Sequence, residues 1–420
     1  MKKILLTGIC LFPLLSGCIL FRQSVKTVPD VYVAQQSQAA QDVETESHPP
    51  ENLNTAAHKA EWQRLNIAVI RACQNGYSEQ AIPAAEQAYR YAHDHLGETH
   101  PNTLASLTNL ANIHETLKQY RKAEPLYREA FRIYEKTLGK EHPDTVNTIE
   151  RLADIYAAQN RYREAEVCYK KVLKLREKTL GAHHPDTLSG IDNLAGLYEA
   201  RGRYGAAEPM FVEVLRLRQN LLGQVHPDTL ASMVSLARLY EMRGRYGEAE
   251  SLSQKVLQIR ESVLGRGHQD TLNALNSLAL LCVKQERYAE AEALYEDALQ
   301  RSETHLGPNH PMTLIALNNL GGLHESQDRY TEAEQYYRRA LAVGKRAMGK
   351  GHPMTLSVVN NLAQLYEFQG MFEKSESLYG AMLQPRQKKP STLPEQLADR
   401  SLPPQHMENR PIQHASPGHI

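Results

Sequence analysis

Seven histidines spaced 42 residues apart are the first feature of this 420-residue chain that could do chemistry. Imidazole nitrogens bind transition metals, so a periodic set invites a metal-binding hypothesis. The residues are His100, His142, His184, His226, His268, His310 and His352. Zinc needs its ligands about 2 Å from one ion, whereas packed helices place equivalent residues of neighbouring units about 10 Å apart. We therefore expect turn histidines, with no metal site and no cofactor.

Paired carboxylates recur along the chain in Glu-Ala-Glu runs such as Glu164-Ala165-Glu166, and such pairs can act as general acid and base. An active site needs one constellation of this kind, whereas repeated copies favour a solvated or helix-capping face. The sequence contains no nucleophile elbow, phosphate-binding loop, zinc-protease motif or dinucleotide fingerprint. We predict that the protein is not an enzyme.

Cys18 follows a short basic segment (1–3) and an apolar run (4–15), in the sequence Leu15-Ser16-Gly17-Cys18. This segment resembles the lipobox of bacterial lipoproteins. The resemblance implies that residues 1–17 are a signal peptide, that Cys18 carries a thioether-linked diacylglycerol, and that the new amino terminus is acylated. The alternative is an ordinary signal peptide with a chance cysteine. Ile19 follows in place of the aspartate associated with inner-membrane retention, which favours the outer membrane, facing the periplasm.

Polar residues without an apolar period fill 18–58, which we interpret as the lipidated cysteine and a disordered tether, and the Pro-rich residues 385–420 are expected to be disordered. Lys plus Arg and Asp plus Glu both total 48, so nucleic acid is not an expected partner. The membrane is expected to be reached through the anchor alone. Cys73, Cys168 and Cys282 have unrelated spacings and are expected to be small buried residues.

The 42-residue repeat predicts the fold, because repeats of this length are stacked supersecondary units. One unit has an apolar stripe from Thr145, a break at 159–161, a second stripe from Tyr162 and a stop at Gly181. We predict an all-α array over 59–384. It comprises a degenerate hairpin at 59–99 and full repeats from 100, 142, 184, 226, 268, 310 and 352.

Two further positions recur in every unit or nearly so. Threonine occurs in all seven units, for example at Thr145, and is the expected N-cap of the first helix. A glutamate column is expected in the first turn of the second helix, where it would meet the positive end of the helix dipole. Its members are Glu124, Glu166, Glu208, Glu250, Glu292 and Glu334.

Leu107-x2-Leu110-Ala111-x2-His114 followed by Ala123-x3-Tyr127 resembles the tetratricopeptide repeat. The 42-residue HPDT-x6-LA-x-LY-x3-GRY-x-EAE-x-LY signature is similar to that of kinesin light chains and their bacterial relatives. The resemblance covers about 65–384. It implies a right-handed α-solenoid of about eight helical hairpins whose first helices line a concave groove.

The same resemblance implies that inner-face residues bind extended peptides. The expected groove residues are Asn109, Asn193, Asn276, Asn318, Asn319, Asn360, Asn361, Glu199, Glu241, Glu325 and Glu367. An asparagine amide can both donate to and accept from a peptide unit. The alternative is that these asparagines are solvated or bond between neighbouring helices. Arg151, Arg238 and Lys284 are the few basic inner-face candidates, so we expect a neutral to acidic groove that prefers uncharged or basic segments.

These features together predict a membrane-anchored scaffold or adaptor that binds a protein or extended peptide in the groove. The alternative is a receptor for a small ligand or signalling peptide in the same groove.

Overall fold

The computed structural model describes residues 53–74 and 79–383, in which every regular element is a helix. The first helices of the hairpins are α2 (Leu53–Gln74), α4 (Pro101–Thr116), α6 (Pro143–Ala158), α8 (Pro185–Ala200), α10 (Pro227–Met242), α12 (Gln269–Lys284), α14 (Pro311–Ser326) and α16 (Pro353–Phe368). The second helices are α3 (Ala81–Leu96), α5 (Tyr120–Thr137), α7 (Tyr162–Leu180), α9 (Tyr204–Leu222), α11 (Tyr246–Leu264), α13 (Tyr288–His305), α15 (Tyr330–Ala347) and α17 (Phe372–Leu383).

The predicted segments outside the array are only partly covered by the structure. Helix α2 begins at Leu53, within the stretch 18–58 that was expected to be a tether. The signal peptide, Cys18 and the tail from 385 lie outside the described residues.

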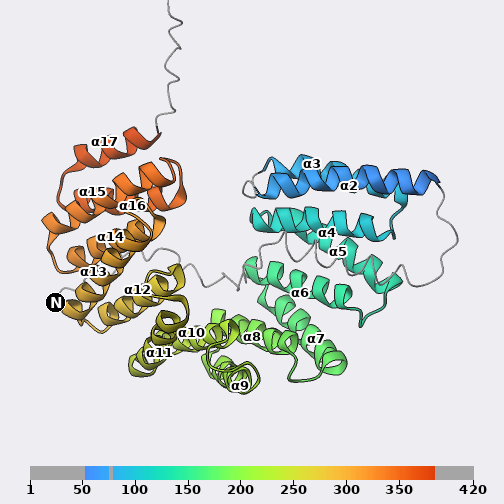
Figure 1. Ribbon diagram of the computed structural model, residues 1–420, viewed down its shortest axis with the longest axis horizontal. Coiled ribbons are helices and arrows are strands. Elements are labelled where there is room, and N and C mark those ends of the chain that lie inside the picture. Colours follow the sequence, from blue (N-terminus) through green and yellow to red (C-terminus); the bar gives the residue numbers. More distant parts are fainter. Residues whose placement is uncertain (1–52, 75–78, 384–420) are drawn as a thin grey trace, which may run out of the picture.

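Successive hairpins stack side by side, and the stack bends into an open arc (Figure 1). Helices α2 and α3 form one end, α16 and α17 form the other, and α8 to α11 lie at the bend. First helices such as α8, α10 and α12 lie on the inner side of the arc, and second helices such as α7, α9 and α11 lie on the outer side. The chain is therefore the α-solenoid that the repeat predicts.

Glycine is invariant in one kind of turn and replaceable in the other. The turn between hairpins contains a glycine in all seven cases, with φ between 85° and 99°. At Gly181 this φ is combined with a ψ of 161°, a region open to glycine alone. In the hairpins from α4 onward the internal turn has one residue with φ between 58° and 73°, the left-handed helical region that Asn160 and Asp328 adopt as well as glycine.

The N-cap of each first helix is the periodic histidine, so the assignment of threonine to this role is wrong. In all seven units the backbone N–H two residues later donates to histidine Nδ1 at 3.1–3.2 Å. The helix of the second full repeat thus begins at Pro143 rather than Thr145. The threonine hydroxyl instead donates in five units to the turn glycine, as Thr145 does to the Gly139 carbonyl at 2.8 Å.

The recurring glutamates also have a different role from the one expected. They lie at the fifth residue of the second helix rather than in its first turn, for example at Glu124 of α5. Arg161 donates to Glu124 of the preceding unit at 2.7 Å and to Glu164 of its own unit at 2.5 Å. The next four units repeat the link to the preceding unit with Arg203, Arg245, Arg287 and Arg329. These glutamates therefore join neighbouring hairpins.

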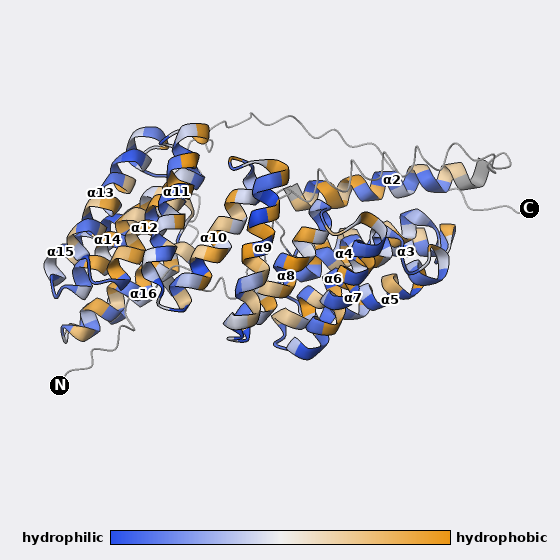
Figure 2. Cartoon of the chain, turned by 90° about the horizontal axis from the view of Figure 1, so that it is seen from below, coloured by the Kyte–Doolittle hydropathy of each residue, from blue (hydrophilic) through white to orange (hydrophobic). Residues whose placement is uncertain are grey.

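The core lies between the helices, and Figure 2 shows hydrophobic and hydrophilic residues mixed along each helix, as expected where one face of a helix is buried. Small residues such as Ala111 and Ala123, both with 0% exposure, let the two helices of a hairpin approach closely. The described cysteines are free; Cys282 is buried, and Cys73 and Cys168 are half-buried against the core. Burial raises the thiol pKa of all three, as expected for structural cysteines.

Two helical glycines provide a test of this packing. A Cβ at Gly321 in α14 would lie 2.6 Å from ring carbons of Tyr337, whereas a Cβ at Gly190 in α8 would meet its nearest atom at 3.8 Å. We expect Gly321→Ala to lower the free energy of unfolding by about 1–3 kcal/mol through overpacking. Gly190→Ala should raise it by about 0.5–1 kcal/mol through helix propensity. Denaturant unfolding would measure both, and equal effects would contradict the close approach at Gly321.

Candidate functional site

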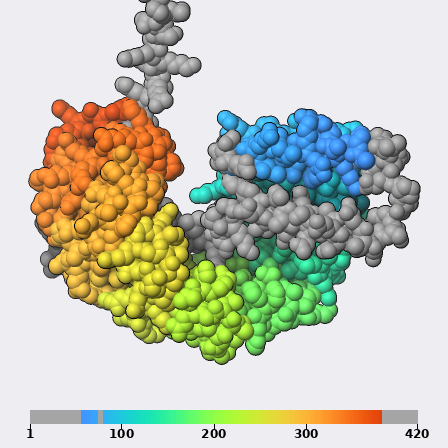
Figure 3. All heavy atoms as spheres, viewed as in Figure 1, coloured from blue at the N-terminus to red at the C-terminus, as the bar shows by residue number. Residues whose placement is uncertain are grey.

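The two ends of the arc, formed by α2–α3 and by α16–α17, are separated by a space (Figure 3). On the inner side of the arc, polar residues form hydrogen bonds between successive units. An inner-face Asn Nδ2 donates to the side chain 43 residues earlier at 2.9–3.5 Å. The pairs are Asn109–Asn66, Asn193–Glu150, Asn319–Asn276 and Asn361–Asn318. The interpretation that these asparagines bond between neighbouring helices is thus correct for six of the seven, and their binding of a ligand stays a prediction.

The most buried of these contacts lies near the C-terminal end of the array. Asn318 and Asn361 are each 2% exposed and are joined at 2.9 Å. Asn276 is also buried, and its amide donates to the Leu272 carbonyl at 3.0 Å. Asn360 is exposed and bonds to no other described residue. Asn360 is therefore the member of this group whose amide is available to another molecule.

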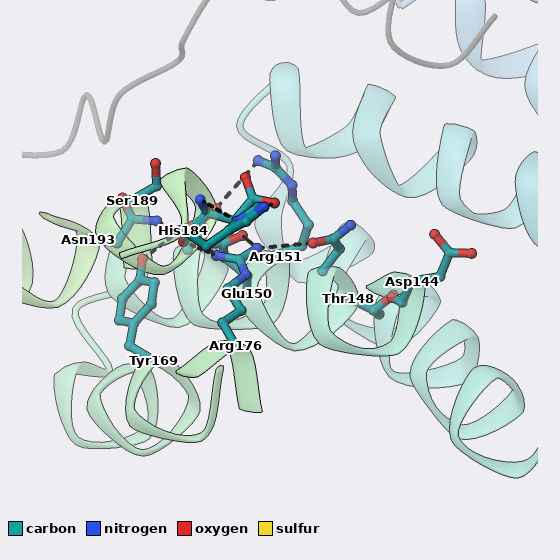
Figure 4. Close-up of polar contacts among 12 residues, drawn as sticks. Asp144, Thr148, Glu150, Arg151, Tyr169, Arg176, His184, Ser189 and Asn193 are labelled. Carbon is teal, nitrogen blue, oxygen red and sulfur yellow. Dashed lines mark hydrogen bonds and ion pairs between the residues drawn. The ribbon is translucent and has the colours of Figure 1, made fainter. Parts of the chain in front are cut away.

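In the middle of the array, charged residues join the same contacts (Figure 4). The Arg176 guanidinium, reaching from α7, donates to both carboxylate oxygens of Glu150 at 2.9 and 2.7 Å. Asn193 donates to the same carboxylate, so one acid links three helices. One unit further on, the fully buried Arg218 donates to one carboxylate oxygen of Asp192 and to the Ser189 hydroxyl. Both arginine charges are thus neutralised by acids of the array itself, so we assign Arg176 and Arg218 a structural role.

The four predicted groove glutamates all have partners. Glu199 pairs with Arg238, and Glu241 pairs with Lys284. Glu325 accepts from the Tyr337 hydroxyl, and Glu367 accepts from Ser375, both at 2.7 Å. Burial raises the carboxyl pKa of Glu199 and Glu325. The third basic candidate, Arg151, lies 3.4 Å from Asp154, so the inner-face charges largely cancel in pairs.

An open hollow of ≈ 320 Å³ lies on the inner face between α10, α12 and α14. Of the predicted residues it is lined by Asn276, Asn318, Asn319, Asn361 and Glu241. Asn109, Asn193, Asn360, Glu199, Glu325 and Glu367 do not line it.

Residues of a second helix, Ser253, Val256 and Arg260, complete the hollow, and the sequence analysis missed them. A signal was present, because Ser253 occupies a position that is aromatic in the other units from α4 onward.

The described residues hold no group of three or more His, Cys, Asp or Glu side chains placed to bind a metal ion. Within the same ranges, no helix is both long enough and apolar enough to cross a bilayer. What the inner face offers is amides, paired charges and one partly apolar hollow. This chemistry suits recognition of another molecule.

The tetratricopeptide repeat family model matches the chain at 144–220, 186–262, 228–304, 270–345 and 312–383, and a second tetratricopeptide repeat model matches 103–144. No curated protein matches the chain.

Several solved structures are similar to the chain. A Podosopora anserina kinesin light chain structure with nearly identical TPR-like repeats is 30% identical, covering 49% of this chain and 98% of its own, with a TM-score of 0.45. BtubC (BKLC) from P. vanneervenii is 24% identical, covering 57% and 99%, with a TM-score of 0.44. The apo form of the quorum sensor NprR from B. thuringiensis is 12% identical, covering 88% and 95%, with a TM-score of 0.53, a likeness of fold alone.

The buried asparagine pair predicts a measurable coupling. Asn318→Ala and Asn361→Ala should each lower the free energy of unfolding by about 1–2 kcal/mol, because each leaves a buried amide unpaired. The double variant should lose less than the sum of the two, as expected for side chains in contact. The control is Asn360→Ala, whose stability should be unchanged or slightly raised because alanine is the better helix former. Additive losses in denaturant unfolding would contradict the coupling.

Proposed function

The chain belongs to the tetratricopeptide repeat family, and we propose that it is a lipid-anchored adaptor that holds a partner protein or extended peptide in its concave groove. Repeats of this family form protein-protein interaction scaffolds. The observation that carries the proposal is the continuous inner face of first helices, a curved surface with exposed polar residues such as Ser277 and Asn360 and with an open hollow between α10, α12 and α14.

The charge of this surface supports a preference for uncharged or basic segments. Arg238 and Lys284 are each neutralised by a glutamate of the preceding unit, so few inner-face cations remain for an acidic partner. Tight binding of a strongly acidic segment along the whole groove would therefore require several existing ion pairs to break.

A bulky residue in the groove tests the adaptor function. Ser277 of α12 is exposed and lines the hollow, whereas Ser251 of α11 is exposed but does not line it. We expect Ser277→Tyr to weaken partner binding at least tenfold, equivalent to about 1.4 kcal/mol, because the ring obstructs the inner face. Ser251→Tyr, the matched control, should bind as the parent does. Partners are captured from envelope extracts, and their affinities for the parent and both variants are measured. Equal binding by the two variants would show that the groove does not bind the partner.

The anchor is the second part of the proposal. A basic start, a short apolar run and small residues before Cys18 support lipidation of that cysteine. Several acyl chains anchor a protein stably where one chain does not. Ile19 supports placement in the outer membrane, with the array facing the periplasm of a bacterial envelope.

Cys18→Ser tests the anchor directly. We expect the parent protein to incorporate labelled palmitate and to sediment with membranes. The serine variant should incorporate none and should appear in the aqueous fraction, because serine provides no sulfur for the thioether. Cys10→Ser, which changes a cysteine inside the predicted signal peptide, is the control and should behave as the parent. Palmitate labelling of the Cys18 variant would contradict the proposal.

The second candidate is a receptor for a small ligand or signalling peptide in the same groove. The hollow of ≈ 320 Å³ favours it, since ligand pockets are concave and mostly apolar with a few polar groups. The fold-level likeness to a quorum sensor is compatible with this candidate. Stabilisation by a ligand without any stable protein partner would distinguish it from the adaptor.

A further inference from the structure

An aromatic side chain is missing from the α10–α11 hairpin. The equivalent position of the other units from α4 onward is occupied by Tyr127, Tyr169, Phe211, Tyr295, Tyr337 and Tyr379. The first five of these rings are at most 3% exposed and fill the space beside the first helix. In α11 the position is Ser253, and α11 has two buried residues, whereas α9 has six. In the α10–α11 hairpin the space that an aromatic ring fills in the other units is therefore left unfilled.

An acid is missing from the same hairpin. Arg176 and Arg218 pair with Glu150 and Asp192 of their own units, and the next residue in this arginine column is Arg260. At the position of the acid this unit has Val234, which is 44% exposed.

Arg260 is consequently a cation without an ion-pair partner. Its guanidinium donates to the Asp270 carbonyl at 3.0 Å, as Arg176 does to the Asp186 carbonyl at 3.2 Å. No carboxylate of the described residues lies within ion-pair distance of Arg260. Burial lowers the pKa of Arg260, whereas Asp270 nearby acts in the opposite direction. A bound anion would supply the charge that Glu150 and Asp192 supply in the earlier units.

The two positions at which this hairpin differs from the other units, Ser253 and Val234, line the same hollow. Ser253, Val234 and Arg260 all line the ≈ 320 Å³ hollow, together with apolar side chains such as Val256 and Leu280. Ser253 and Arg260 lie seven residues apart on α11, which is about 10 Å along two turns of one helix face. The length of the arginine side chain allows the cation to approach the unfilled ring position. One small molecule could therefore contact both.

We propose that this hollow is a binding site for a small aromatic carboxylic acid, with the ring beside Ser253 and the carboxylate on Arg260. The ring would occupy the volume that tyrosine or phenylalanine fills in the other units. The carboxylate would pair with the guanidinium as Glu150 pairs with Arg176, by two charge-assisted hydrogen bonds. This site goes beyond the adaptor function, and its absence would leave partner capture along the rest of the groove unaffected.

The test uses 3-phenylpropionate as the probe, titrated into the full chain in mild detergent by calorimetry and thermal shift. We expect saturable binding with a raised Tm, and at least tenfold weaker binding of 3-phenylpropanamide, which keeps the ring but lacks the charge. An N-acetylated peptide ending in phenylalanine is the second arm, because it presents the same ring and carboxylate from a protein source. Binding of that peptide without binding of the free acid would overturn the proposal.

Two variants restore the residues of the other units and should close the site. Ser253→Tyr refills the ring position, and Val234→Glu supplies Arg260 with an internal partner. We expect each to fold at least as stably as the parent and to weaken 3-phenylpropionate binding at least tenfold. Ser251→Tyr, on the same helix but outside the hollow, should bind the probe as the parent does. Unchanged binding by both restoring variants, or equal binding of acid and amide by the parent, would overturn the proposal.

Discussion

The structure depends on the fact that no hairpin can bury its apolar surface alone. Each second helix packs against its own first helix and against the first helix of the next unit, so every interior hairpin has two neighbours. The fully buried alanines at positions such as Ala153 and Ala165 set how closely these helices approach. Because each unit repeats the same small rotation, the stack curves, and a concave inner face follows from the packing.

The regular part of this arrangement could be predicted from the sequence, because the apolar period and the turns repeat in register. The errors concern polar groups with two physically reasonable partners. Histidine Nδ1 replaces the expected threonine oxygen at the cap, and Glu124 finds an arginine 37 residues later in place of a helix terminus. The cap is a local contact between residues two apart, whereas the glutamate contact depends on how successive hairpins are offset, which one unit of sequence does not specify.

On the inner face, too, the positions of the residues could be predicted from the sequence but their partners could not. The columns that contain Asn319 and Asn361 could be located by register, but their bonding to residues 43 positions earlier required the coordinates. Residues such as Ser253 were missed because a search restricted to first helices ignores the second helices that reach the groove between them. Departures from the repeat at Ser253 and Val234 carry information that the repeated residues do not, since the repeated residues mainly maintain the stack.

The α10–α11 hairpin also has a mechanical consequence. The two largest clusters of buried side chains divide inside α12, with Ala274 in one and Leu275 in the other, and α11 contributes little to either. At the register position of the asparagine links this boundary has Val234 and Ser277, while Lys284 pairs with Glu241 across it. Bending at this joint is therefore resisted by fewer buried apolar residues of α11, together with ion pairs such as Arg287 with Glu250 and Lys284 with Glu241.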